Sequence, residues 1–307
     1  MTVPSVAVED DAVESAAGGH PKQGAAHRRN LAWLGLLPFF AYLAIFLVWP
    51  TITVFTQALQ GENGATTSAL TEAVTGQYQE AFIASLRLSF VTALLGALIG
   101  VLLAYAAATL RRPKWLRSGT TAFSGVAANF GGIPLAFAFI AALGTQGLMT
   151  KILKSSGLDL QAHGLTVRSF WGLVIVYLYF QIPLMVLVTF PAIDGLKPAW
   201  REAAANLGAR SWTYWRRVGI PVLAPAILGG FLLLFANAFS AYATAYALTG
   251  GSSNLVTLQI RFFLQGNTIT GKGQLGFALA AWMIIIMGVS MTGYLLLRRK
   301  AERWRRA

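Results

Sequence analysis

The sequence predicts an all-α membrane protein that crosses the bilayer six times. Of its 307 residues, 56% are hydrophobic and only 11% are charged, whereas soluble chains carry roughly 25% charged residues. The hydrophobic residues gather into six runs, each long enough to cross the ~30 Å hydrocarbon core, which takes ~20 apolar residues in a helix. A helix is favoured there because it pairs its backbone polar groups internally.

Each predicted span is bounded by polar or charged residues. The six are Leu31–Leu59, Phe82–Leu110, Thr120–Leu143, Ser169–Ile193, Gly219–Leu248 and Leu275–Leu297. Prolines at positions 38, 50, 134 and 183 predict kinks inside spans, and those at 221 and 225 fall in the first turns of the fifth span, where a missing N–H costs least. Residues 1–30 carry too little apolar surface to fold and are expected to be a disordered tail. The first apolar run is about twice the length of a signal-peptide core, so an uncleaved span is expected.

The positive charges predict the orientation of these spans. If the amino terminus is cytoplasmic, the cytoplasmic segments, including a basic tail at 301–307, hold 18 of the 24 Lys and Arg residues. Short basic loops are retained in the cytoplasm, so both termini are placed there. The formal charge of +13 does not indicate nucleic-acid binding, because the basic residues flank apolar runs and are not gathered on one face.

The chain lacks the usual signs of catalysis and of ion coupling. It has no cysteine, and its three histidines are not spaced as a metal cluster. Its eleven acidic residues all lie outside the predicted spans, which argues against a carrier driven by an ion gradient. Gly266–Gly273 has the P-loop spacing, but Gly273 stands where Ser or Thr must reach Mg²⁺, so a flexible outer loop is expected there.

A basic loop, residues 194–221, separates the fourth and fifth spans. A turn at Asp194–Pro198 leads into a helix expected from about Ala199, and Gly208 is the expected stop. Glu202 near the helix start is favourably placed against the helix dipole, and the small alanines after it allow another surface to approach closely. By itself, such a loop could serve only to set the topology.

The loop's motif changes this interpretation. Glu202-Ala203-Ala204, three residues, Gly208, nine residues and then Val218-Gly219-Ile220-Pro221 resembles the EAA loop of the permease subunits of ATP-binding-cassette (ABC) importers. Val218 and Ile220 replace the usual Ile and Leu, which are conservative changes. The six-span topology extends the resemblance over most of residues 31–300.

The resemblance implies a coupling helix that docks into a separate ATPase, with Glu202, Ala203, Ala204 and Gly208 as docking residues. It also implies two cytoplasmic ATPase subunits, a second permease subunit, expected to be a different chain, and an extracytoplasmic substrate-binding protein. ATP and Mg²⁺ would be bound by the ATPase subunits. This chain would need no cofactor and would not be an enzyme.

Neutral polar residues inside the spans are candidates for the substrate path. They are Asn129, Gln181, Asn237, Ser240, Tyr242 and Thr244. Each could instead form a helix-to-helix hydrogen bond worth ~1 kcal/mol, and Gly96 to Gly100 forms a small-residue face expected only to pack helices.

The cargo is less clearly indicated by the sequence. Residues 238–258 are similar to permeases of the spermidine/putrescine type, which favours a small polar solute such as a polyamine. Iron, thiamine, phosphonate and sugar permeases of the same class remain alternatives, as does an ion-coupled secondary carrier.

Overall fold

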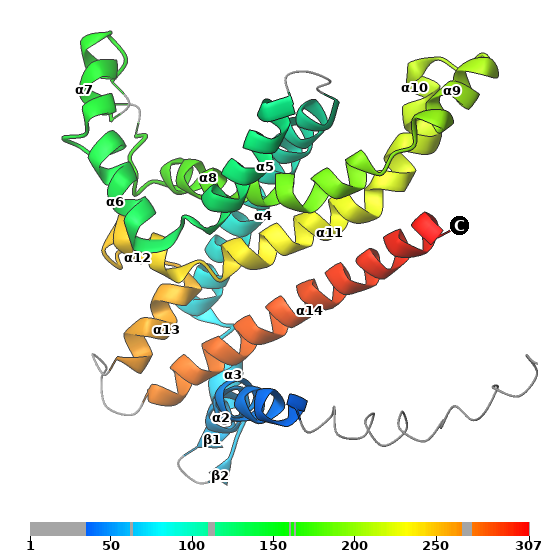
Figure 1. The fold of residues 1–307 in the computed structure, drawn as a ribbon. Coiled ribbons are helices and arrows are strands. Elements are labelled where there is room, and N and C mark those ends of the chain that lie inside the picture. The colour runs from blue at the N-terminus through cyan, green and yellow to red at the C-terminus, as the bar shows by residue number, and fades with distance from the viewer. Residues whose placement is uncertain are drawn as a thin grey trace, which may run out of the picture. The chain divides into compact units, whose positions relative to one another are not determined.

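The computed structural model describes residues 35–61, 64–109, 114–159, 161–162, 164–265 and 272–306. The predicted tail at 1–30 and most of the Gly266–Gly273 motif lie outside them. The described chain is helical apart from one short antiparallel strand pair (Figure 1). Its elements are η1 (Ala44–Val48), α2 (Trp49–Ala58), β1 (Gln60–Gly61), β2 (Gly64–Ala65), α3 (Ser68–Glu72), α4 (Gly76–Thr109), α5 (Lys114–Asn129), α6 (Gly132–Leu143), α7 (Leu148–Ser155), α8 (Phe170–Asp194), α9 (Pro198–Asn206), α10 (Ser211–Tyr214), η2 (Trp215–Gly219), α11 (Ile220–Phe239), α12 (Tyr242–Thr249), α13 (Val256–Leu264) and α14 (Gly273–Arg306).

Six helical stretches of the described chain are long and apolar enough to cross a membrane, as the sequence predicts. They are Gly35–Ala58, Gly76–Thr109, Gly132–Ser155, Phe170–Asp194, Ser211–Phe239 and Gly273–Arg299. The second is 34 residues long, or about 51 Å at 1.5 Å per residue, so it extends well beyond the hydrocarbon core. Glu80, predicted to precede this span, therefore lies in α4 near its start.

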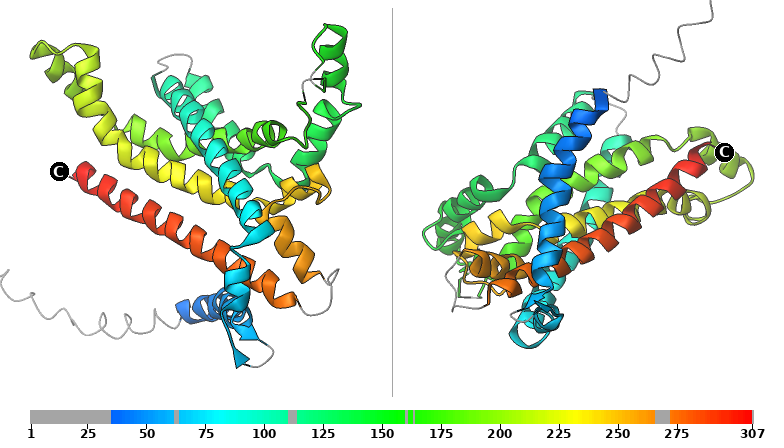
Figure 2. Two further views of the ribbon diagram at one scale, coloured as in Figure 1. Left: turned by 180° about the vertical axis from the view of Figure 1, so that it is seen from behind. Right: turned by 90° about the horizontal axis from the view of Figure 1, so that it is seen from below.

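The chain divides into two compact units, residues 1–53 and 54–307. In the second unit, α4 packs against α8 and α11, and α11 packs against α14; Figure 2 shows α11 and α14 running side by side. Gly96 and Gly100 make the α4–α8 contact close, because an added Cβ would lie 2.9 Å from Cβ of Gln181 or 2.5 Å from Cβ of Met185. The prediction that this small-residue face packs helices is confirmed.

The predicted third span is wrong as one continuous helix. Thr120–Leu143 is divided between α5 and α6, with a break at Phe130–Gly131. Gly132 begins α6 with φ at +72°, a conformation that side chains disfavour. Pro134 therefore lies in the first turn of α6, where its missing N–H breaks no helical bond.

The predicted fifth span, Gly219–Leu248, is also two helices. α11 ends at Phe239 and α12 begins at Tyr242. The break exposes the carbonyl of Ala241, and the buried hydroxyl of Tyr177 in α8 donates a hydrogen bond to that oxygen at 2.9 Å. Irregular backbone at membrane depth is tolerated where protein groups pair it in this way.

The prolines of the predicted spans end no helix, and the predicted kinks stay a prediction. Pro183 lies inside α8 and Pro225 inside α11, with each helix unbroken in its bounds. Pro50 and Pro221 each lie two residues after a π-helical turn, η1 and η2 respectively. In both turns the next amide bonds five residues back, Trp49 to Ala44 and Ile220 to Trp215. These turns change the bonding register just before a residue that has no N–H to donate.

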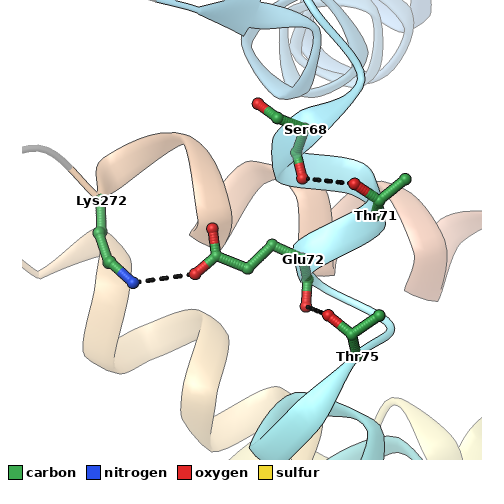
Figure 3. A network of polar contacts seen from close by, with 5 residues as sticks. All are labelled: Ser68, Thr71, Glu72, Thr75 and Lys272. Atoms are coloured by element: carbon green, nitrogen blue, oxygen red, sulfur yellow. Dashed lines mark hydrogen bonds and ion pairs between the residues drawn. The ribbon is translucent and has the colours of Figure 1, made fainter.

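The helix ends opposite α9 and α10 are joined by polar contacts within the second unit. Lys272, just before α14, donates to Glu72 at the end of α3 at 2.9 Å (Figure 3), and this carboxylate raises the pKa of Lys272. The hydroxyl of Ser85 in α4 accepts the amide of Val256 at 2.9 Å and so caps α13 from another helix.

Candidate functional site

The loop between α8 and α11 contains the short helix that its sequence predicts. α9 starts with Pro198 at its first position and ends at Asn206. Gly208 follows with φ at +74°, while the amide of Gly208 bonds to Ala205 O and that of Ala209 to Ala204 O, both at 2.9 Å. This is a Schellman end, which needs a left-handed residue at Gly208. The predicted helix and its stop are confirmed.

The residues of α9 are exposed or half-buried. None of its residues is buried. Glu202 is exposed and has no ion pair with any described residue, and Ala203 is also exposed while Ala204 is half-buried. Leu207, directly after the helix, is 87% exposed. A buried-type side chain held open beside small residues is typical of a surface that a partner covers.

Sequence reasoning missed two apolar residues of this loop. Leu207 lies within the EAA motif spacing, and Trp212 in α10 is 72% exposed. Both stand in a strongly basic segment where an apolar side chain has no local role. That contrast is visible in the sequence and was the signal for them.

Residues at both ends of the loop contact neighbouring helices. At its start, Arg117 of α5 forms an ion pair with Asp194 of α8 at 2.6 Å and lies over the ring of Phe190. At its end, the ring of Trp215 meets Tyr105 of α4 edge-on with centroids 5.3 Å apart. The same ring covers Gly219, where any side chain would overlap it. These contacts fix the two ends of the loop against α4 and α5.

A cavity of about 700 Å³ lies between α9 and the ends of α4 and α8. Its walls include Tyr105, Thr109, Asp194, Lys197, Arg201, Glu202, Tyr214 and Trp215. Glu202, predicted to dock a partner, thus lies at the edge of a hollow with charges of both signs.

The six candidate path residues fall into two groups. Gln181 is fully buried; its Nε2 donates to Leu234 O at 3.0 Å across the α8–α11 contact, while its Oε1 has no hydrogen-bond partner among the described residues. The buried Thr244 accepts the amide of Gly132 at 2.9 Å and so joins the two helix breaks. These two residues act in helix packing.

The other four candidate residues keep accessible polar groups. Asn129 is exposed and bonds only within α5, to Gly125 O. Asn237 is half-buried, and its side chain makes no hydrogen bond to any residue that the structure describes. Ser240 is exposed at the second break, and the half-buried Tyr242 stacks on Tyr246 with centroids 5.6 Å apart.

The two breaks lie next to each other because of the Gly132–Thr244 bond, and α6 packs against α12 (Figure 1). Asn129 immediately precedes the first break, and Asn237 and Ser240 lie at the second. The structure thus brings together the ends of two spans that are separated by a hundred residues. No local sequence signal indicates this juxtaposition.

Comparison with known proteins identifies the architecture. The family described as "Binding-protein-dependent transport system inner membrane component" matches residues 96–306, more than half of the chain. The chain belongs to this family. The family consists of membrane transport proteins rather than enzymes, which confirms the prediction from the sequence.

Relatives within the family carry different cargo names. The chain is 28% identical over 129 residues to the thiamine transport system permease protein of Escherichia coli, covering 41% of this chain and 23% of the relative. It is 28% identical over 162 residues to the spermidine/putrescine transport system permease protein PotB of Haemophilus influenzae, covering 52% and 56%. The chain thus spans about half or less of the curated relatives' length.

A solved structure shares the fold. It is that of a bacterial ABC transporter involved in the import of the acidic polysaccharide alginate, with a TM-score of 0.66 at 20% identity, covering 90% of this chain and 96% of the other. This similarity supports the all-helical permease fold.

Proposed function

We propose that the chain is one permease subunit of an ABC importer and transmits movement from an ATPase through α9. The observation that carries this is an EAA-type helix with no buried residue, in a loop whose two ends contact α5 and α4. Leu207 and Trp212 would enter the cleft of the ATPase as apolar anchors, with Glu202 meeting a cationic group or a backbone donor.

The proposed assembly has a second permease subunit, two cytoplasmic ATPase subunits and an extracytoplasmic binding protein, with both termini of this chain in the cytoplasm. When ATP closes the ATPase pair, the coupling helices of the two permeases move together and the path opens outward. Hydrolysis and product release let it reopen inward. ATP and Mg²⁺ act on the ATPases, and this chain contributes half of the path.

A single charge reversal tests the coupling. With Glu202→Lys, the permease should lose co-purification with the ATPase subunits and ATP-driven uptake by at least tenfold, because an exposed docking acid becomes a cation. Glu80→Lys makes the same charge change at an exposed residue near the start of α4 and should leave both unchanged. A secondary carrier or a scaffold would be indifferent to both changes, so wild-type uptake in Glu202→Lys with the complex intact would exclude the coupling role.

We further propose that Asn129, Asn237, Ser240 and Tyr242 line the path near the two breaks. Asn237 is the sharpest test because its amide is half-buried and meets no described partner. Asn237→Leu, which keeps the branched shape of the side chain and removes its amide, should change uptake or basal ATPase activity several-fold with the complex still assembled. The matched change in a packing residue, Gln181→Leu, should instead act on the melting temperature; unchanged kinetics in Asn237→Leu would remove it from the path.

The cargo is proposed more broadly than a polyamine. Relatives are named for thiamine, molybdenum and spermidine/putrescine, so family membership alone selects no single compound. The polyamine suggested by residues 238–258 stays a prediction, and the predicted spans contain no carboxylate to pair with its cationic groups.

A further inference from the structure

Positive charge prevails on the side of the chain that the proposed orientation places outside the cell. Segments on that side carry six basic and four acidic residues: Arg87, Lys151, Lys154, Arg168, Arg261 and Lys272 against Glu62, Glu72, Glu80 and Asp159. Two of the acids are already paired, Glu72 with Lys272 at 2.9 Å and Asp159 with Lys154 at 3.2 Å. The remaining charge on this side is mostly that of arginine.

Arg261 of α13 lies closer to an aromatic ring than Arg87 does, the other of these cations that lies over a ring, whose guanidinium carbon is 5.1 Å from the centre of the Phe170 ring. The guanidinium carbon of Arg261 lies 3.7 Å from the centre of the Tyr246 ring. Tyr246 in turn stacks on Tyr242, with centroids 5.6 Å apart and planes inclined by 20°. Tyr242 is the first residue of α12 after the break. The stack therefore leads from the outer surface directly to the break in the fifth span.

The stack leaves one edge of the guanidinium available. Its Nε donates to Oε1 of Gln265 at 2.7 Å. Arg261 forms no ion pair with an acidic residue that the structure describes. The ring holds the guanidinium plane in place while its two terminal amino groups remain to donate. A planar pair of N–H groups of fixed orientation fits the two oxygens of a phosphate or carboxylate group.

We propose that Arg261, held by Tyr246, is a contact point for an oxyanion group of the cargo at the outer entrance of the path. This rests on the proposed importer function and narrows its substrate class: the cargo is an anion or a zwitterion. A polyamine would meet a fixed cation there and no unpaired acid on α12 or α13, since these helices contain none. Tyr242, a candidate path residue from the sequence, then supports Arg261 through Tyr246.

Binding of defined probes to the whole transporter tests this. The complex with its partner permease and ATPases is placed in phosphatidylcholine nanodiscs, and its melting temperature is measured against phosphate, molybdate, acetate and spermidine at constant ionic strength. At least one oxyanion should raise the melting temperature saturably. Arg261→Gln should weaken that apparent affinity about tenfold, the loss expected when a charged, paired hydrogen bond is removed.

Matched variants separate the contact from general charge. Arg168→Gln removes an exposed arginine on the same side that lies over no ring, and should leave the affinity unchanged. Tyr246→Phe keeps the ring and should behave as wild type, whereas Tyr246→Leu should weaken binding several-fold. Arg261→Lys should give an intermediate affinity, because it keeps the charge and loses the paired donors.

Several outcomes would overturn the proposal. They are equal oxyanion affinity in Arg261→Gln and wild type, no response to any oxyanion, or a response to spermidine alone. If adding phosphatidylglycerol to the nanodiscs raises the melting temperature and no soluble oxyanion does, Arg261 binds a lipid phosphate and does not belong to the cargo site. Co-purification of Arg261→Gln with the ATPases should stay normal; that readout belongs to Glu202, so failure of the importer function is seen separately.

Discussion

Gly208→Val is expected to abolish ATP-driven uptake while leaving the membrane helices folded. Gly208 has φ at +74° and ends α9 through the Schellman bonds to Ala204 and Ala205. A β-branched residue is strongly disfavoured in this conformation, at a cost of order 1–3 kcal/mol. The helix end would be rebuilt, and Leu207 and Trp212 would no longer face the partner together. Uptake and ATPase co-purification should both fall by more than tenfold.

Gly208→Asn is the control that separates the effect of backbone conformation from that of side-chain size. An added Cβ at Gly208 meets nothing within 4 Å, so size alone costs nothing in this chain. Asn adopts left-handed φ values more readily than other side chains do, and Gly208→Asn should keep most of the uptake that Gly208→Val loses. If both variants are equally inactive, direct contact of the ATPase with Gly208 explains the loss and the conformational argument fails.

The loop was largely predictable from the sequence because its signals are local. A helix that starts at Pro198 and stops at Gly208 follows from residue types whose backbone preferences act over a few positions. The exposed fraction of Leu207 follows only from the fold, since leucine as a residue type is most often buried. The six apolar stretches were predictable for the same reason as the loop, because length and hydropathy need no tertiary information.

The two helix breaks were missed for different physical reasons. At the first, Gly131, Gly132 and Pro134 form a recognisable interruption, and the expectation of a single span set that signal aside. At the second, Ser240 and Ala241 are ordinary helix residues, and no proline or glycine stands beside them. The break there is stabilised by Tyr177, a residue more than sixty positions away, which local preferences cannot reveal.

The environments of the polar residues in the spans also could not be predicted from local sequence preferences. Gln181 and Asn237 look alike in the sequence, each a lone amide in an apolar run. The structure buries Gln181 against Leu234 and leaves Asn237 half-buried without a described partner. Which residue packs and which faces open space depends on how the helix is rotated against its neighbours. That rotation is set by close contacts such as those of Gly96 and Gly100.

The close contact of Gly100 with α8 predicts the second large effect, a loss of stability. Gly100→Ala should destabilise the permease by about 1–3 kcal/mol, the usual cost of forcing extra atoms into a packed core. The new Cβ would lie 2.5 Å from Cβ of Met185 and 2.9 Å from the carbonyl oxygen of Ile182. Neither neighbour is a flexible side-chain end, so α4 and α8 must separate. Separation would also disturb the nearby Gln181–Leu234 hydrogen bond, because Gly96 lies one turn away on the same face.

Gly288→Ala is expected to shift the melting temperature in the opposite direction to Gly100→Ala. Gly288 lies within α14, is exposed, and has nothing within 4 Å of an added Cβ. Alanine should stabilise that helix by about 0.5–1 kcal/mol, since glycine loses more backbone freedom on folding. The melting temperature in detergent should therefore fall for Gly100→Ala and rise or stay level for Gly288→Ala. Equal shifts for both variants would mean that helix propensity alone decides the result and that the α4–α8 contact has room to spare.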